Sequence, residues 1–275
     1  MISKKKLGAL NQIRCFLLDM DGTLYLDEKL LPGAEQLIRW LEVRHLEYLL
    51  LTNNSSRNSR DYLKKLRKLG LNAIKQNRIL TSGEAACLYL KKKKRSAKVF
   101  ILGTPTLHWE FKQHGFITTG SEPEMVLLGF DTTMTYKKLW KFCDFVRAGL
   151  PYYATHADIN CPTEKGFMPD AGSIIALIKE STGREPDVVI GKPNQPMLVS
   201  IMEKTGFPLE QTAILGDRLY TDMAMGRYGL FTILTLSGET KLDDLHDSQY
   251  QPDLIIENID ELLILLNKVK GDDVR

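Results

Sequence analysis

The sequence predicts an α/β protein that has a core with a parallel sheet and a second, inserted α/β unit. Short apolar runs alternate with helical segments along the 275 residues, which is the pattern of parallel α/β folds. Four of these runs end in polar residues that suit one kind of site: Cys15–Leu18, Tyr48–Leu51, Val188–Ile190 and Ala213–Leu215. Between the second and third runs lies another strand-helix alternation without such ends, which indicates an insertion between core strands.

The first run ends in a pair of aspartates. Cys15–Leu18 reads as a short buried strand, and Asp19 and Asp21 follow at its carboxyl end. Positions i and i+2 of an extended chain share a face, so the two carboxylates address one small volume. Gly22 then allows a tight turn and a close approach of the backbone to a ligand. Acid pairs also occur as plain turn formers, but this arrangement suits a hard cation and a phosphoryl group.

The other three runs end in hydroxyl and amide groups, a lysine and further acids. These residues are Thr52, Asn53 and Asn54 after the second run, Lys192 after the third, and Asp217 and Asp222 after the fourth. Ligands of open parallel sheets lie outside the carboxyl ends of the strands, so the ends together predict a metal- and phosphate-binding site. Polar loops after apolar strands are common, and residues 52–54 also fit a helix N-cap.

The remaining elements follow in chain order. Helices are expected at Leu37–Glu47 and Asp61–Leu69, around the strand that ends at Thr52. The inserted unit should contain strands at Val99–Leu102, Met125–Leu128 and Tyr152–Ala154 and helices at Thr106–Gln113, Tyr136–Ala148 and Ser173–Ser181. From Asp187 the chain is expected to return to the core, and Leu262–Leu266 to form the buried face of a final helix. The predicted domains are residues 1–80 with 186–275, and residues 81–185.

Composition excludes some functions. A hydrophobic content of 43%, a charged content of 26% and a net charge of +3 are ordinary for a soluble globular protein and give no case for nucleic-acid binding. The basic run Lys91–Arg95 could be a nucleic-acid or localisation patch, but it reads better as the solvated end of a helix that begins near Ser82.

The chain has no sign of secretion or of a membrane segment. Its four cysteines lack metal-ligand spacing and read as reduced thiols: Cys15, Cys87, Cys143 and Cys161. The first 14 residues lack the continuous apolar region of a signal peptide, and Leu262–Leu266 is far too short to span a bilayer. We therefore expect a cytoplasmic protein with no membrane partner, and the sequence leaves a homodimer open.

The ordered motifs resemble a known superfamily. Asp19-Met20-Asp21-Gly22-Thr23, then Thr52-Asn53, Lys192, and Gly216-Asp217 with Asp222 are similar to the four-motif signature of the haloacid dehalogenase (HAD) superfamily. Longer stretches resemble its subfamily IIA of NagD-like and p-nitrophenyl phosphatases: LLTNNSS, ATHADINCP, GSIIALIKESTG, VVIGKPN and ILGDRLYTDMAMG. The resemblance spans nearly the whole chain. It implies a Rossmann-like core, an inserted α/β cap of the C2 type, Mg²⁺ and an aspartyl-phosphate intermediate.

The resemblance also implies roles for the acids. Asp19 would be the nucleophile, since a carboxylate can form an acyl phosphate, and it would also be a metal ligand; the alternative is that it is a metal ligand only. Asp21 would protonate the leaving oxygen and then activate water, and its backbone carbonyl would reach the metal. Asp217 would be a direct Mg²⁺ ligand. Asp222 would support the metal shell through water or orient Lys192.

The other site residues would bind phosphate or substrate. Residues expected to bind phosphate are Gly22, Thr52, Asn53, Asn54 and Lys192, with the lysine supplying a compact cation.

The stretch from Tyr153 to Thr163 resembles the cap loop that faces the core, and its candidate substrate contacts are Asp158, Asn160 and Cys161. His156 in the same loop is not expected to be a catalytic base. Cys161 aligns with a histidine of relatives that hydrolyse pyridoxal phosphate or phosphoglycolate, which argues against those substrates.

These inferences predict a magnesium-dependent phosphomonoesterase for small phosphorylated metabolites, such as sugar phosphates, nucleoside monophosphates or aryl phosphates. A phosphotransferase or mutase could use the same aspartyl phosphate, and a non-catalytic binding protein could share the fold. No catalytic position is missing, which disfavours the binding protein. A dehalogenase needs no magnesium, so Asp217 and Asp21 would have no purpose in it.

Overall fold

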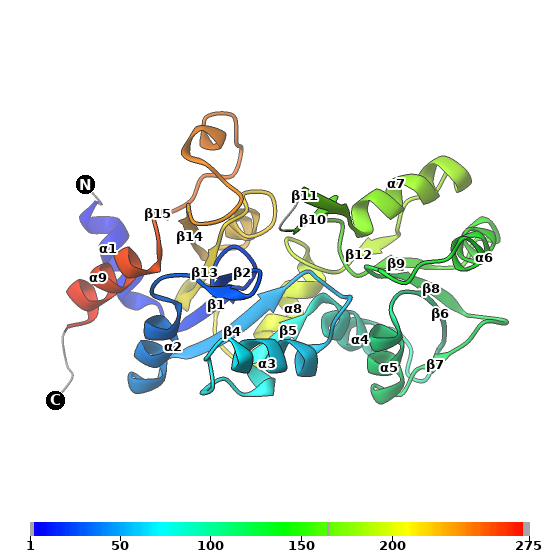
Figure 1. The fold of residues 1–275 in the computed structure, drawn as a ribbon, viewed down its shortest axis with the longest axis horizontal. Helices are drawn as coiled ribbons and strands as arrows, with labels where there is room; N and C mark the ends of the chain where they lie inside the picture. The colour runs from blue at the N-terminus through cyan, green and yellow to red at the C-terminus, as the bar shows by residue number, and fades with distance from the viewer. Residues whose placement is uncertain (1–2, 164–165, 272–275) are drawn as a thin grey trace. The chain divides into compact units, whose positions relative to one another are not determined.

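The computed structural model describes residues 3–163 and 166–271 (Figure 1). The chain divides into two compact units. The first unit comprises residues 1–51, 63–79 and 201–275, and the second comprises residues 52–62 and 80–200. Among the described residues, none of the helices has the length and apolar character needed to cross a membrane.

The first unit is built on a six-stranded sheet with the strand order β15-β14-β13-β1-β4-β5. Its strands are β1 (Cys15–Asp19), β4 (Glu47–Thr52), β5 (Ile79–Thr81), β13 (Thr212–Gly216), β14 (Phe231–Thr235) and β15 (Leu254–Ile256). The pairs β1–β4, β1–β13, β13–β14 and β14–β15 are parallel. The carboxyl ends of β1, β13 and β14 therefore point to the same edge of the sheet, where the ligand of such a fold is expected.

Helices and short turns complete the first unit. They are α1 (Lys4–Gln12), α2 (Ala34–Val43), α9 (Ile259–Lys270), the 3₁₀ turns η1 (Gln76–Arg78), η2 (Leu209–Gln211), η3 (Met223–Tyr228) and η4 (Leu242–Leu245), and the hairpin β2 (Tyr25–Leu26)–β3 (Lys29–Leu30). The helices α3 (Ser59–Lys68) and α8 (Gln195–Thr205) cross the boundary between the units. In Figure 1, α9 lies beside α1, and the Lys270 ammonium donates to the carbonyls of Asn11 and Ile13, both at 2.8 Å.

The second unit is built on a five-stranded sheet with the strand order β12-β9-β8-β6-β7. Its elements are α4 (Ser82–Lys93), β6 (Lys98–Leu102), α5 (Pro105–Gln113), β7 (Ile117–Thr118), β8 (Met125–Leu128), α6 (Tyr136–Arg147), β9 (Tyr152–Ala154), β10 (Asn160–Thr163), β11 (Gly166–Pro169), α7 (Ala171–Thr182) and β12 (Val188–Val189). The helices α6 and α7 bury their apolar faces on the sheet, in a core that includes Phe100, Phe142 and Ile178. Both sheets have the parallel α/β character that the sequence predicts, so the fold-class prediction is confirmed.

Two local expectations are wrong. The run Val188–Ile190 was expected in the core sheet, but Val188 and Val189 pair with Tyr153 and Ala154 of β9 in the five-stranded sheet. A run of two or three apolar residues fits either sheet edge, and its partner is decided by packing far away in the sequence. The helix expected at Leu37–Glu47 ends at Val43, because the chain turns through a left-handed His45 (φ 52°) and Glu47 begins β4.

The basic run at the end of α4 behaves as expected. The helix ends at Lys93, and residues 91–95 are all exposed. Its N-cap residue is Thr81, whose hydroxyl accepts a hydrogen bond from the Glu84 backbone N–H at 3.0 Å. Lysines in the last turn interact favourably with the negative end of the helix dipole, so the run needs no ligand to explain it.

Candidate active site

Three buried carboxylates lie together at the carboxyl ends of β1 and β13. Asp19 is the last residue of β1, and Asp217 and Asp222 follow β13, its parallel neighbour. One carboxylate oxygen from each residue lies within 4.8 Å of the others, and the three residues are 9%, 2% and 0% exposed. In residues 3–163 and 166–271 this is the only group of three such side chains close enough to hold a metal ion.

The Asp217 carboxylate is confined on two sides by glycines. A Cβ atom at Gly22 (φ 86°) or at Gly238 would overlap this carboxylate. Its Oδ2 atom accepts a hydrogen bond from the backbone N–H of Glu239 at 2.7 Å. Its Oδ1 atom is buried and has no hydrogen-bond partner among the residues that the structure describes. A buried acceptor without a donor is costly, so the site is suited to a cation.

Electrostatics leads to the same conclusion. Burial, followed by the negative charge of Asp222, raises the pKa of Asp217 to about 7. Asp222 is itself fully buried, and its Oδ2 atom accepts from the Arg218 N–H at 3.2 Å. Adjacent buried carboxylates repel each other unless a proton or a cation lies between them, so this cluster fits a hard divalent cation that prefers oxygen ligands.

The Asp21 carboxylate lies outside the three-carboxylate group. The Tyr25 hydroxyl donates to its Oδ2 atom at 3.1 Å, and the Lys65 ammonium is 3.6 Å from its Oδ1 atom. Lys65 also lies over the Tyr25 ring, 3.9 Å from the centroid. Neither partner of Asp21 was expected from the sequence. Tyr25 follows Asp21 by four residues, a weak signal, and no spacing links Lys65 on α3 to the aspartate.

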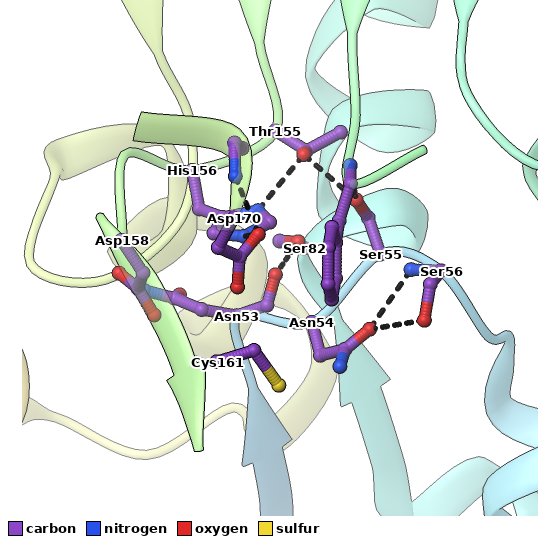
Figure 2. A network of polar contacts seen from close by, with 12 residues as sticks. Asn53, Asn54, Ser55, Ser56, Ser82, Thr155, His156, Asp158, Cys161 and Asp170 are labelled. Atoms are coloured by element: carbon purple, nitrogen blue, oxygen red, sulfur yellow. Dashed lines mark hydrogen bonds and ion pairs between the residues drawn. The ribbon is translucent and has the colours of Figure 1, made fainter. Parts of the chain in front are cut away.

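The loop after β4 is organised by its own side chains. Thr52 ends β4, and the preceding Leu51 pairs with Asp19 in the sheet. The Thr52 hydroxyl accepts from the Asn54 N–H at 3.1 Å. The Asn54 carboxamide oxygen accepts from the N–H and hydroxyl of Ser56 at 2.9 and 2.7 Å (Figure 2). Asn54 therefore shapes the turn, as asparagine commonly does.

Asn53 holds the backbone of Lys192 within the second unit. Its Oδ1 atom accepts from the Lys192 N–H at 2.8 Å, and its Nδ2 atom donates to the Lys192 carbonyl at 3.0 Å. The same Nδ2 atom donates to the Asp158 carboxylate at 3.0 Å. Both amide hydrogens are thus used within the protein, so the backbone N–H of Asn53 is the group left to consider as a phosphate ligand. The sequence alone could not distinguish the side-chain amide of Asn53 from its backbone N–H as the phosphate ligand.

The three candidate cap contacts occupy different environments. Asp158 is 6% exposed and bonded to Asn53, so it connects the cap loop to the loop after β4. Asn160 and Cys161 lie on β10, where they pair with Pro169 and Met168 of β11. Asn160 is exposed and Cys161 is intermediate in exposure. The structure therefore places Asp158 beside Asn53, and Asn160 and Cys161 on the hairpin.

His156 belongs to a buried chain of hydrogen bonds (Figure 2). Its Nδ1 atom is 3.0 Å from the Thr155 hydroxyl, which is itself 2.9 Å from the Ser55 hydroxyl. Its Nε2 atom is 2.9 Å from a carboxylate oxygen of Asp170, the N-cap residue of α7. Both ring nitrogens contact protein groups, which agrees with the expectation that this histidine is not a catalytic base.

Comparisons with known proteins agree with this architecture. Residues 16–117 match the family model for haloacid dehalogenase-like hydrolases, and residues 189–262 match a second model for HAD-like hydrolases. The chain is 31% identical over 261 residues to an acid sugar phosphatase of Staphylococcus aureus, covering 94% of this chain and 100% of that one.

Two solved structures are also similar. One is a 4-nitrophenylphosphatase from Thermotoga maritima, with 44% identity, a TM-score of 0.90 and coverage of 92% of this chain and 97% of that chain. The other is NagD from E. coli K-12, with 29% identity, a TM-score of 0.84 and coverage of 90% and 98%.

The chain therefore belongs to the haloacid dehalogenase-like hydrolases. Within them it falls among the NagD-like and p-nitrophenyl phosphatase-like proteins of subfamily IIA, as the motifs indicated. It is a phosphatase that acts on small phosphate esters.

We expect the affinity of this carboxylate group for Mg²⁺, the cation that the sequence predicts, to weaken as the pH falls through about 7. The pKa of Asp217 is raised to about 7 in the metal-free protein, so protons compete with the cation below that pH. The apparent Kd should rise by up to about tenfold per pH unit. Calorimetric Mg²⁺ titrations at pH 8, 7 and 6 measure this, and a Kd independent of pH would contradict the assignment of Asp217.

We expect Asp158→Ala to lower the free energy of unfolding by about 1–3 kcal/mol, because it removes an acceptor from the buried Asn53 amide. Asp158→Asn keeps an acceptor oxygen and should cost less. The control is Asp144→Ala, because the Asp144 carboxylate is 56% exposed and pairs with Arg147. This variant should lower the free energy of unfolding by no more than about 1 kcal/mol. Urea unfolding gives these values. Equal losses for the two Asp158 variants would show that the hydrogen bond has no such role.

Proposed function

We propose that this phosphatase is magnesium-dependent and forms an aspartyl-phosphate intermediate on Asp19. The observation that carries the proposal is the group of three buried carboxylates around Asp19, in which one Asp217 oxygen is buried and has no hydrogen bond to any residue that the structure describes. We further propose that residues 1–80 and 186–275 act as the catalytic core and residues 81–185 as a C2-type cap, except that Val188 and Val189 pair within the five-stranded sheet of the second unit. The four free cysteines of the chain support a cytoplasmic location.

The residues present fit Mg²⁺. Asp19 and Asp217 would hold it through carboxylate oxygens and Asp21 through its backbone carbonyl, while Asp222 would support this shell. Magnesium commonly uses one or two protein carboxylates together with phosphate oxygens and waters, so a small acid set suffices. When bound, the ion would offset the negative charge of the phosphoryl group and of the attacking carboxylate.

The proposed reaction has two transfers. An Asp19 carboxylate oxygen attacks phosphorus and the ester P–O bond breaks, while Asp21 gives a proton to the leaving oxygen. Asp21, now a carboxylate, takes a proton from water, and the water oxygen attacks phosphorus. The bond from phosphorus to Asp19 breaks, inorganic phosphate leaves and both aspartates return to their starting states. The Tyr25 hydroxyl and the Lys65 ammonium contact the two oxygens of the Asp21 side chain and orient it for both proton transfers.

Phosphate would be bound by cationic and neutral donors. Lys192 supplies a positive charge, and its backbone is held on both sides by the Asn53 side chain. The Thr52 hydroxyl and the backbone N–H groups of Asn53 and Gly22 are the proposed neutral donors. Asn54 contributes by shaping the loop. Phosphoryl transfer depends mainly on positioning and charge neutralisation, which these groups provide.

The proposed substrates are small phosphate monoesters. The similarity to an acid sugar phosphatase and to a 4-nitrophenylphosphatase supports sugar phosphates and aryl phosphates, and nucleoside monophosphates belong to the same chemical class. Asn160 and Cys161, on the hairpin β10–β11, are the proposed residues for substrate choice. Asp158 would act indirectly, through Asn53.

We expect Asp19→Asn to lower phosphate release by roughly three orders of magnitude or more, as loss of an essential nucleophile does. The measurement is phosphate release from p-nitrophenyl phosphate and a panel of sugar phosphates and nucleoside monophosphates, with Mg²⁺ and with chelator. The exposed variant Asp144→Asn is the control. Substantial turnover by Asp19→Asn would contradict the covalent route, and full activity in chelator would contradict the metal.

A further inference from the structure

A segment outside all the predicted motifs lies against the carboxylate group. Residues 237–240, reading Ser-Gly-Glu-Thr, follow β14. β14 is the parallel neighbour of β13, so the segment starts at the same edge of the sheet as Asp217. We call it the 237–240 segment. Sequence reasoning gave it no role, because it contains neither an acid pair nor a lysine after a glycine.

The segment bonds the backbone and the side chain of Asp217. The Glu239 N–H donates to the Asp217 Oδ2 atom at 2.7 Å, and the Thr240 N–H donates to the Asp217 carbonyl at 3.2 Å. Gly238 lies so near the carboxylate that a Cβ atom there would overlap it. One carboxylate oxygen is thus occupied by the segment, and the other has no hydrogen bond in the described part of the chain.

The segment also contacts the loop that follows β1. The Ser237 hydroxyl donates to the Gly22 carbonyl at 3.1 Å, and it lies 2.9 Å from the Thr235 hydroxyl. Gly22 is the second glycine that leaves room for Asp217. The 237–240 segment therefore connects the two loops that carry the acids, one after β1 and the other after β13.

The Glu239 side chain adds two contacts to the loop after β13. Its Oε2 atom is 2.8 Å from the Arg218 Nε atom, and its Oε1 atom accepts from the Tyr220 hydroxyl at 3.0 Å. Its carboxylate is 37% exposed, so the ion pair contributes little stability by itself. Its effect is geometric, because it fixes the residue whose N–H binds Asp217.

We propose that the 237–240 segment is the positioning element of the metal site. It holds the Asp217 carboxylate in one orientation, with Oδ2 bonded to Glu239 and Oδ1 left for the cation. Without these contacts the repulsion from Asp222 would favour side-chain rotations that separate the carboxylates, and the cation would have to restore the arrangement at a cost in affinity. The inference rests on the proposed Mg²⁺ site.

Gly238→Ala tests the inference directly. Gly238 does not have a positive φ, so alanine fits the backbone and its main effect is the overlap with Asp217. We expect the Kd for Mg²⁺, measured by calorimetry on the full chain at pH 8, to rise about tenfold or more, which corresponds to about 1.4 kcal/mol. The control is Gly8→Ala, since a Cβ atom at Gly8 meets no atom within 4 Å. An unchanged Kd for Gly238→Ala would overturn the inference.

Glu239→Ala gives a second test that does not depend on how Gly238→Ala folds. It keeps the N–H that binds Asp217 but removes the contacts to Arg218 and Tyr220. The Kd should rise, though less than for Gly238→Ala. Wild-type affinity in Glu239→Ala would mean that the side chain does not position the segment.

A double-mutant cycle in metal-free protein separates this inference from the proposed function. If Gly238→Ala acts through the Asp217 carboxylate, it should cost unfolding free energy in wild type and much less in Asp217→Ala. Additive losses would overturn the positioning role. If the wild-type protein bound no Mg²⁺, the proposed magnesium dependence would be contradicted. The unfolding free energies of the cycle would still show whether the segment positions Asp217.

Discussion

The mutual repulsion of three buried carboxylates is the constraint on which the rest of the structure depends. Asp19, Asp217 and Asp222 offer oxygens within 4.8 Å of one another at 9% exposure or less. Such a group is unfavourable without a proton or a cation, and burial, followed by the negative charge of Asp222, raises the pKa of Asp217 to about 7 in the metal-free protein. The fold brings these charges together because β1 and β13 are parallel neighbours, and the function follows from what such a group binds.

Backbone and small residues maintain this arrangement. Gly22 and Gly238 leave space for the Asp217 carboxylate, and the Glu239 N–H fixes one of its oxygens. In the second unit Asn53 serves a comparable purpose, because its side chain bonds both backbone groups of Lys192 and the Asp158 carboxylate. In both places groups that take no part in the proposed chemistry, namely the Asn53 side chain and the backbone of Gly238 and Glu239, hold the groups proposed to do it, as precise catalytic geometry requires.

Sequence reasoning succeeded where the signal was local. The acids at the end of β1 and after β13 follow apolar runs directly, so their strands and the parallel α/β class could be predicted. It failed where the partner lies far along the chain. The two-residue strand at Val188–Val189 pairs with β9. The contacts of Lys65 with Asp21 and of Glu239 with Asp217 join residues of separate elements that no spacing rule relates. The hydrogen bonds of the Asn53 side chain also join it to residues far along the chain, Asp158 and Lys192.

The most direct measurement is a rapid-quench reaction of wild type with excess p-nitrophenyl phosphate and Mg²⁺, followed by mass analysis of the peptide that contains Asp19. A phosphorylated peptide that forms within one turnover, disappears when substrate is exhausted and is absent in Asp19→Asn is the predicted result. Turnover with no phosphoryl group on Asp19 at any quench time, and with one on another residue, would contradict the role assigned to the carboxylate group.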